Sequence, residues 1–459
     1  MEKYDLIVIG SGAGMNVASR ATGQGMRVAL IEHGPIGGTC LNTGCIPSKI
    51  LIYPADIARI IDSARAIGIE CHIERIDVPL IMRRMRSFVE EERRMMEIGV
   101  EATDNLDWYR ETGEFVGDYQ LKVGGEIITA AKIVIASGSR ALVPPIPGLK
   151  EAGYLDNASL LSQSKLPQSI VLLGGGYIAC EYGHFFSAMG SKVTILGRSP
   201  QLLKNEDPEI SKIVEKGLSK YVDLLTNYEV VRVEGKAGKK VVFAVNRSTG
   251  AIEEFSCDEI LVAAGRRSNA DLLKPDKTGV ETDRGGWIKV DEYLETTKRG
   301  IWAFGDAIGK HMFRHTANYE SRVVWKNAFT EEKVKVDYHA VPHAVFTYPQ
   351  VGSVGMSEKE ARALGFDILV GKAWYRDVAK GYAMGDLDGF VKVVVNRRNG
   401  RILGSQIAGE GAPDLVQQIT YLMNTEEQNY EPMRRAQVIH PALSEVLVHA
   451  FANLHQSED

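Results

Sequence analysis

The chain has 459 residues, more than one hydrophobic core organises, so several domains are expected. Its formal net charge of −5, with both signs interspersed, offers no basic footprint, and no nucleic-acid partner is expected. No apolar run reaches the ~18 residues of a membrane helix, no targeting segment is visible, and five cysteines do not suit a disulfide-stapled secreted protein. We therefore expect a cytoplasmic protein without membrane attachment.

The first motif is a dinucleotide-binding signature at the start of the chain. Its parts follow one another in the order strand, glycine turn, helix, strand, acid: residues 4–9, then Gly10, Gly12 and Gly14, then 16–24, 26–31 and Glu32. The glycines let a pyrophosphate approach the helix N-terminus, and the acid accepts hydrogen bonds from a ribose. Met15 stands where a third glycine is expected, but the complete order still predicts a dinucleotide site.

Two cysteines, Cys40 and Cys45, follow five positions apart on a glycine-containing turn that is predicted to run into a helix. This spacing lets the sulfurs close and reopen a disulfide without moving the backbone far. Unpaired N–H groups at a helix start favour a thiolate. A structural disulfide, or two unrelated buried thiols, is the alternative. Cys71, Cys180 and Cys257 lie among apolar neighbours and are expected to be buried and inert.

A second dinucleotide signature lies in the middle of the chain. A strand over 169–173 precedes Gly174, Gly176 and Tyr177, a helix runs to residue 189, and a strand over 192–196 follows. That strand is followed by Gly197 instead of an acid, and Arg198 and Lys204 come next. A missing acid beside two cations favours a coenzyme with a 2′-phosphate, hence NADPH over NADH. The alternative is that both cations are solvated surface charges.

Two dinucleotide folds and a cysteine pair resemble the class I pyridine nucleotide–disulfide oxidoreductases, the family of glutathione reductase, dihydrolipoyl dehydrogenase, mycothione reductase and mercuric reductase. The likeness extends over essentially the whole chain. Four further motifs carry it. Residues 136–140 and 263–266 resemble the two crossings between the flavin and nicotinamide domains, 300–306 the second flavin signature, and 440–445 the catalytic acid/base segment.

The resemblance implies an α/β fold with two Rossmann-like domains, for FAD and NAD(P), and a C-terminal α+β dimerisation domain. The expected limits are 1–149 and 271–337 for the FAD domain, 150–270 for the NAD(P) domain and 338–459 for dimerisation. It also implies a homodimer. Beyond the first glycine turn, the expected cofactor-binding residues are Gly38, Thr39, Ser137, Gly138 and Asp306 for FAD, and Gly174, Gly176, Tyr177, Arg198, Lys204 and Gly265 around the nicotinamide coenzyme.

The resemblance also implies catalytic roles. Hydride passes from NADPH through the flavin to the Cys40–Cys45 disulfide, with Cys45 against the flavin and Cys40 facing the substrate. His440 exchanges protons with the sulfurs and Glu445 orients its ring, both acting on the other subunit's cysteines. The remaining expectations are a Lys49–Glu181 ion pair beside the flavin and no metal site, because His311 and His315 lack further ligands at suitable spacing.

The substrate is less sharply indicated. Residues 46–49 and 441–445 look like dihydrolipoyl dehydrogenases, whereas 375–384 and 268–273 look most like mycothione reductase. No cysteine follows Cys257, so mercuric ion reduction is not expected. The leading interpretation is reduction of a low-molecular-weight disulfide by NADPH. Oxidation of dihydrolipoamide with NAD⁺ is the close alternative. A diaphorase and a non-catalytic flavoprotein subunit are the remote ones.

Overall fold

The computed structural model describes residues 1–236 and 238–456, and its first layer is a five-stranded parallel sheet. Its strands, in spatial order, are β18 (Ile301–Ala303), β8 (Ile133–Ile135), β2 (Leu6–Ile9), β3 (Val28–Ile31) and β4 (Leu106–Tyr109). The first four are buried along their whole length, which explains their continuous apolar sequences. Because β18 follows the whole second domain in sequence, the chain leaves this sheet and returns to it.

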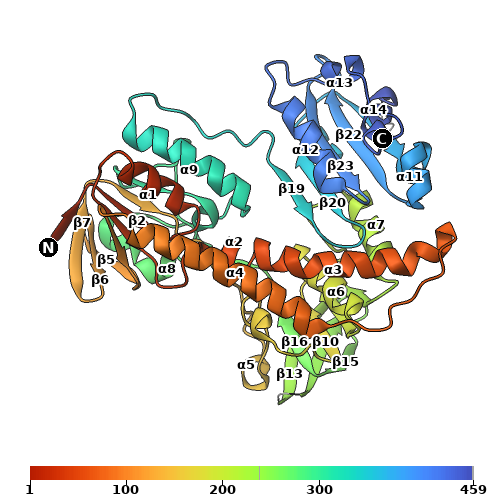
Figure 1. Ribbon diagram of the computed structural model, residues 1–459, viewed down its shortest axis with the longest axis horizontal. Coiled ribbons are helices and arrows are strands. Elements are labelled where there is room, and N and C mark those ends of the chain that lie inside the picture. The colour runs from red at the N-terminus through yellow and green to blue at the C-terminus, as the bar shows by residue number, and fades with distance from the viewer. Residues whose placement is uncertain (237, 457–459) are drawn as a thin grey trace.

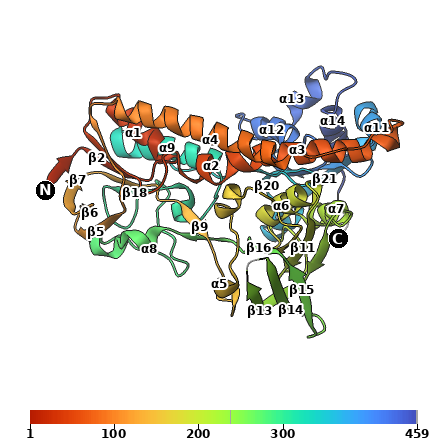
Figure 2. The same ribbon diagram turned by 60° about the horizontal axis from the view of Figure 1, so that its bottom comes forward.

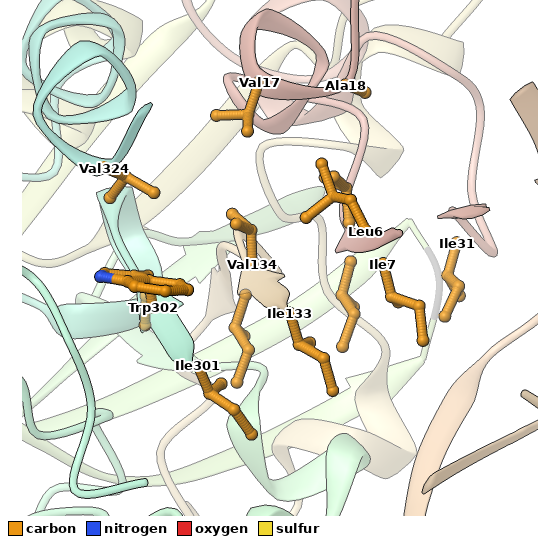
Figure 3. Packing of buried hydrophobic residues seen from close by; sticks show 14 of the residues in the cluster. Leu6, Ile7, Val17, Ala18, Ile31, Ile133, Val134, Ile301, Trp302 and Val324 are labelled. Atoms are coloured by element: carbon orange, nitrogen blue, oxygen red, sulfur yellow. The ribbon is translucent and has the colours of Figure 1, made fainter. Parts of the chain in front are cut away.

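Helices α1 (Gly14–Thr22) and α9 (Arg314–Phe329) cover one face of this sheet. Figure 3 shows Val17 of α1 and Val324 of α9 facing the strand residues Leu6, Val134 and Trp302. A smaller sheet flanks the layer, with β1 (Glu2–Tyr4), β7 (Glu126–Ala130), β6 (Gln120–Val123) and β5 (Gly113–Gly117) in spatial order. The helix faces and the parallel strands together form the predicted Rossmann-like layer.

A second parallel sheet repeats this design lower in the molecule (Figure 1). Its spatial order is β12 (Asp223–Thr226), β11 (Lys192–Gly197), β10 (Ser169–Leu173) and β16 (Glu259–Val262), with α6 (Tyr177–Ala188) and α7 (Pro208–Leu218) as helices. An antiparallel sheet of β13 (Tyr228–Lys236), β14 (Lys239–Asn246) and β15 (Ile252–Cys257) adjoins it.

A two-stranded ribbon joins the first and second domains. β9 (Ser139–Ala141) and β17 (Arg266–Ser268) pair antiparallel where the chain leaves the first domain and re-enters it. The short helices α5 (Leu149–Ala152) and α8 (Ala270–Leu273) follow these two strands. The domain limits given above stay predictions, but both crossings fall where the two sequence motifs indicate them.

Long helices link the first two domains, as Figures 1 and 2 both show. They are α3 (Cys45–Ser63), which follows the short α2 (Gly38–Asn42), and α4 (Val78–Glu101). Leu51 of α3, Met82 of α4 and Phe185 of α6 belong to one buried cluster, so α3 is held against the second domain. The expectation that Cys71 is buried is wrong, because the segment between α3 and α4 leaves it exposed.

The C-terminal part is an antiparallel sheet covered by helices. Its spatial order is β19 (Pro342–Val345), β20 (Val351–Gly355), β23 (Ile402–Ala408), β22 (Phe390–Asn396) and β21 (Ile368–Trp374). The helices are α10 (Glu358–Ala363), α11 (Ala379–Met384), α12 (Ala412–Met423), α13 (Glu431–Arg435) and α14 (Glu445–Ala452). Buried Lys392 of β22 lies 3.1 Å from Asp207 and 3.0 Å from Glu209 at the start of α7, which joins this part to the second domain.

Among the described residues, no helix combines the length and the apolar character that a membrane crossing requires.

Candidate active site

The two glycine turns are built alike. Gly10 has φ of +102°, and a Cβ there would lie 2.2 Å from the carbonyl oxygen of Ala136. Gly174 has φ of +138°, and a Cβ there would lie 2.2 Å from the carbonyl oxygen of Ala263. Each first glycine therefore passes tightly against the end of the neighbouring strand, a position that no other residue fills without strain. The predicted requirement for glycine has the same physical cause in both domains.

Gly14 makes the close helix–strand contact that was expected of a third glycine at the position of Met15. A Cβ on Gly14 would lie 2.9 Å from Cγ1 of Val8, whereas Met15 is half-buried against the core. In the second turn Ala179 is fully buried and meets the same need with a methyl group. Gly176, in contrast, faces open space, as close approach of a dinucleotide requires.

One cavity of about 1130 Å³ brings most of the predicted site together. It lies where the first domain, α3, α6 and the C-terminal sheet meet. The predicted residues that line it are Gly10, Gly12, Glu32, Gly38, Thr39, Cys40, Cys45, Lys49, Ser137, Gly138, Tyr177, Glu181 and Asp306. The predicted residues outside its lining are Gly14, Gly174, Gly176, Arg198, Lys204, Gly265, His440 and Glu445.

The polar groups in this cavity fit FAD. Ser137 and Thr316 line it, and the buried hydroxyl of each has no hydrogen-bond partner within the described part of the chain. Glu32 accepts hydrogen bonds from the backbone N–H and the hydroxyl of Ser11, at 3.0 and 2.9 Å, which fixes its carboxylate beside the glycine turn. Glu32 would hold the ribose there, and the glycine turn the pyrophosphate.

Asp306 lies at the other end of the same cavity. Its carboxylate accepts a hydrogen bond from the Ser139 hydroxyl at 2.5 Å and lies 3.5 Å from Nε of Arg266. Ser139 and Arg266 come from the ribbon strands β9 and β17, so the domain crossing also orients Asp306. Asp306 would hold the ribityl chain. Both of its partners lie in the crossing motifs at 136–140 and 263–266, but sequence reasoning did not connect either residue with Asp306.

The cysteine pair spans two helices instead of one turn. Cys40 lies inside α2, and Cys45 is the first residue of α3. Both are free thiols. Cys40 donates a hydrogen bond to Cys45, and together with the nearby charge of Lys49 this lowers the pKa of Cys45 to about 7. The same hydrogen bond, with burial, raises the pKa of Cys40. The site thus prepares Cys45 as the thiolate.

The predicted ion pair between Lys49 and Glu181 lies near Cys45. Nζ of Lys49 lies 2.8 Å from Oε2 of Glu181, which is buried on α6. The other Glu181 oxygen accepts a hydrogen bond from the backbone N–H of Phe346 at 3.0 Å, and the Phe346 ring lies 4.7 Å from Nζ of Lys49. Three parts of the chain therefore fix the position of the Lys49 charge beside Cys45.

Replacing Cys40 with alanine is expected to raise the pKa of Cys45 toward that of an ordinary thiol, because the variant loses the donor that stabilises the thiolate. Lys49→Met is expected to raise it as well, by removing a cation. The measurement is the rate of Cys45 alkylation by iodoacetamide against pH in the reduced protein, followed on the Cys45 peptide by mass spectrometry. Exposed Cys71 in the same digest is the internal control. Unchanged midpoints in both variants would contradict the assignment.

His440 and Glu445 form a pair of their own. Nδ1 of His440 lies 2.8 Å from Oε1 of Glu445, and the other Glu445 oxygen accepts a hydrogen bond from the backbone N–H of Ala442. The hydrogen bond from His440 lowers the pKa of Glu445, so the acid stays charged. The His440 side chain is 74% exposed, and Figures 1 and 2 place α14 well away from α2. Within one chain this pair does not reach the cysteines.

The coenzyme end of the second domain contains a residue that sequence reasoning missed. Arg198 and Lys204 are exposed, and Nε of Arg198 lies 3.4 Å from Glu229. Arg247 contacts the same acid at 3.6 Å and donates a hydrogen bond to the Arg198 carbonyl oxygen. Arg247 follows β14, far from the glycine turn, so no motif pointed to it. Two arginines thus share one acid at this edge of the sheet.

Two further residues were predicted to lie around the nicotinamide coenzyme, Tyr177 and Gly265. Tyr177 is the first residue of α6 and lines the cavity, between the glycine turn of the second domain and the cysteine pair. Gly265 lies at the domain crossing with φ of +121°. Among the described residues, no cluster of three or more His, Cys, Asp or Glu side chains is arranged to hold a metal ion.

Comparisons with known proteins agree with this geometry. The sequence matches pyridine nucleotide-disulphide oxidoreductase over residues 4–321 and the dimerisation domain of that family over residues 341–451. Mycothione reductase of Mycobacterium tuberculosis (strain ATCC 25618 / H37Rv) is 37% identical, with 99% of this chain and 100% of the relative covered. Dihydrolipoyl dehydrogenase of Chlamydia muridarum is 33% identical, with 97% and 95% covered.

A solved structure shares the whole fold. It is the HOCl-induced flavoprotein disulfide reductase RclA from Escherichia coli, with a TM-score of 0.87, 30% identity, and 98% of this chain and 99% of that chain covered. Fold and site define a flavin-dependent enzyme that exchanges electrons between a pyridine nucleotide and a disulfide. The chain belongs to the pyridine nucleotide-disulphide oxidoreductase family, whose cofactors are FAD and a pyridine nucleotide.

Proposed function

We propose that this enzyme uses NADPH to reduce a low-molecular-weight disulfide related to mycothione. The observation that carries the proposal is the edge of the second sheet, where Gly197 replaces the acid and Arg198 and Arg247 gather around Glu229. A 2′-phosphate there would bring a second anion to two arginines that share a single carboxylate. The 37% identity to mycothione reductase over nearly the full length supports a substrate of this size and kind.

The thiols would carry the exchange with the substrate. Bound FAD would supply transfer of an electron pair from the nicotinamide to the Cys40–Cys45 disulfide, which would leave a Cys40 thiol and a Cys45 thiolate. The Cys40 sulfur then attacks one sulfur of the substrate disulfide, which forms a mixed disulfide and releases the first product as a thiolate. The Cys45 thiolate attacks Cys40, which restores the Cys40–Cys45 disulfide and releases the second thiol. One disulfide bond is reduced and one is formed.

His440 would handle the protons of these steps. Its ring nitrogen opposite Glu445 would take the proton of the Cys40 thiol before attack and give it to the departing thiolate. Because His440 lies outside the cavity of its own chain, we propose that it acts on Cys40 of a second copy, in a homodimer with shared sites. The match to the family's dimerisation domain supports this arrangement.

The coenzyme assignment is tested by Arg198→Glu. The variant is expected to lower kcat/KM for NADPH by about 10- to 100-fold, because a charge-assisted hydrogen bond becomes a repulsion, and to leave kcat/KM for NADH within a few-fold. The measurement compares steady-state kcat/KM for NADPH and for NADH in wild type and variant. Lys236→Glu, at the far end of the antiparallel sheet, changes charge equally and is the control.

Two outcomes would overturn this assignment. An unchanged ratio of NADPH to NADH reactivity in Arg198→Glu would show that these arginines are solvated surface charges. A wild type that prefers NADH would favour the alternative function, oxidation of dihydrolipoamide with NAD⁺. That alternative is also supported by residues 46–49 and 441–445 and by the similarity to dihydrolipoyl dehydrogenase of Chlamydia muridarum. Transfer to quinones alone would favour a diaphorase.

A further inference from the structure

Arg314, the first residue of α9, projects into the cavity at the first glycine turn. It lines the cavity and is half-buried. Its Nη1 lies 3.7 Å from the position that a Cβ on Gly12 would take, and the Cα of Gly38 lies 3.8 Å from the same position. The guanidinium therefore stands where the two glycine segments meet, beside the helix N-terminus that a dinucleotide pyrophosphate approaches.

The charge of Arg314 has no partner within the described part of the chain. Three lysine or arginine side chains line the cavity. Lys49 pairs with Glu181, and Arg266 lies against Asp306 and Ser139. No ion pair or hydrogen bond joins the Arg314 side chain to any described residue. Removing a guanidinium partly from water without a partner costs free energy, so this cation is placed for an anion that the chain does not supply.

The anion that fits is a pyrophosphate. The turn from Gly10 to Gly14 contains no cation, so alone it offers only backbone N–H groups and the dipole of α1 to a group with two negative charges. Thr316, two residues beyond Arg314, also lines the cavity, and its buried hydroxyl has no hydrogen-bond partner among the described residues. We infer that Arg314 binds the pyrophosphate of FAD and supplies the positive charge that the glycine turn lacks.

One competing partner is the Cys40 sulfur. The Arg314 charge favours the thiolate of Cys40 and opposes the rise of its pKa. That effect is smaller than the effects of Cys45 and of burial on the same thiol. If the cation served the thiol, its removal would alter sulfur chemistry and leave FAD binding unchanged. The inference rests on FAD as the cofactor but not on the choice of NADPH or of the disulfide, so its failure is separable from theirs.

The test uses the holoenzyme of Arg314→Met. We expect FAD to be released on dilution at least ~10-fold faster than from wild type, because a charge-assisted contact is lost. The release rate should also depend less on salt, and the two ³¹P resonances of bound FAD should shift. Arg322→Met, an exposed arginine on the same helix, is the matched control and should change none of these values.

Arg314→Lys keeps the charge and covers the case in which the methionine variant does not fold. It should retain FAD within a few-fold of wild type while moving the ³¹P resonances, because a single ammonium replaces the guanidinium fork. FAD release and ³¹P shifts equal to wild type in both variants would overturn the inference. So would a change confined to the pH dependence of Cys40 alkylation, which would assign Arg314 to the thiol.

Discussion

Replacing Cys45 with serine is expected to abolish disulfide reduction and to spare electron transfer from the flavin to a quinone. A hydroxyl cannot form the Cys40–Cys45 disulfide, and it cannot carry the negative charge that Cys40 and Lys49 stabilise on the sulfur. Loss of a group that acts as part of a catalytic unit costs about 10⁴-fold or more in kcat. The measurement is steady-state NADPH oxidation with a small disulfide and, separately, with a quinone.

Cys71→Ser is the matched control, because Cys71 is an exposed thiol outside the cavity. It should keep both activities. Persistent disulfide turnover in Cys45→Ser would refute the mechanism. Equal quinone activity in both proteins, with no disulfide turnover in wild type, would favour the diaphorase. Loss of flavin from Cys45→Ser would be visible in the absorption spectrum and would separate a folding defect from a chemical one.

The parts of the site that short sequence motifs encode were predictable. Gly10 and Gly174 are constrained by contacts with Ala136 and Ala263, and those constraints recur in both domains because the same strand–turn–helix unit recurs. The predicted pairs Lys49–Glu181 and His440–Glu445 do form. Neither pairing follows from sequence spacing alone. Both were predicted from the family resemblance.

The residues that sequence reasoning missed act through tertiary contacts. Arg247 reaches Arg198 and Glu229 only because the β14–β15 turn folds against the end of β11. Arg314 lines the cavity because α9 begins there. Sequence reasoning missed it because an arginine at the start of a helix is usually solvated. No local pattern separates these arginines from surface charges.

The error over Cys71 has a different cause. Its apolar neighbours Ile67, Ile69 and Ile73 predict burial, yet all three are themselves exposed, between 39% and 56%. The segment between α3 and α4 forms no strand or long helix that would turn one face toward a core. Apolar composition predicts burial only when a periodic element presents those side chains to a partner.

His440→Gln is expected to lower kcat for disulfide reduction by about 10²- to 10⁴-fold, the usual contribution of a positioned acid/base. The glutamine side chain reaches as far but takes up no proton at neutral pH. Reduction of the flavin by NADPH should proceed as in wild type, because His440 lies outside the cavity of its own chain. Stopped-flow reduction and steady-state turnover, measured on one preparation, separate the two half-reactions.

Mixing subunits then tests whether the site is shared between chains. Cys45→Ser and His440→Gln are each nearly inactive as homodimers, but in a heterodimer one site receives intact cysteines from one chain and intact His440 from the other. Random re-pairing of equal amounts should restore about one quarter of wild-type activity, since half of the dimers then hold one intact site of two. A site contained in a single chain would restore none, because every site would keep one defect. Restored activity would therefore assign His440 to the second copy and explain why the His440 side chain is exposed and lies outside the cavity that holds the sulfurs of its own chain.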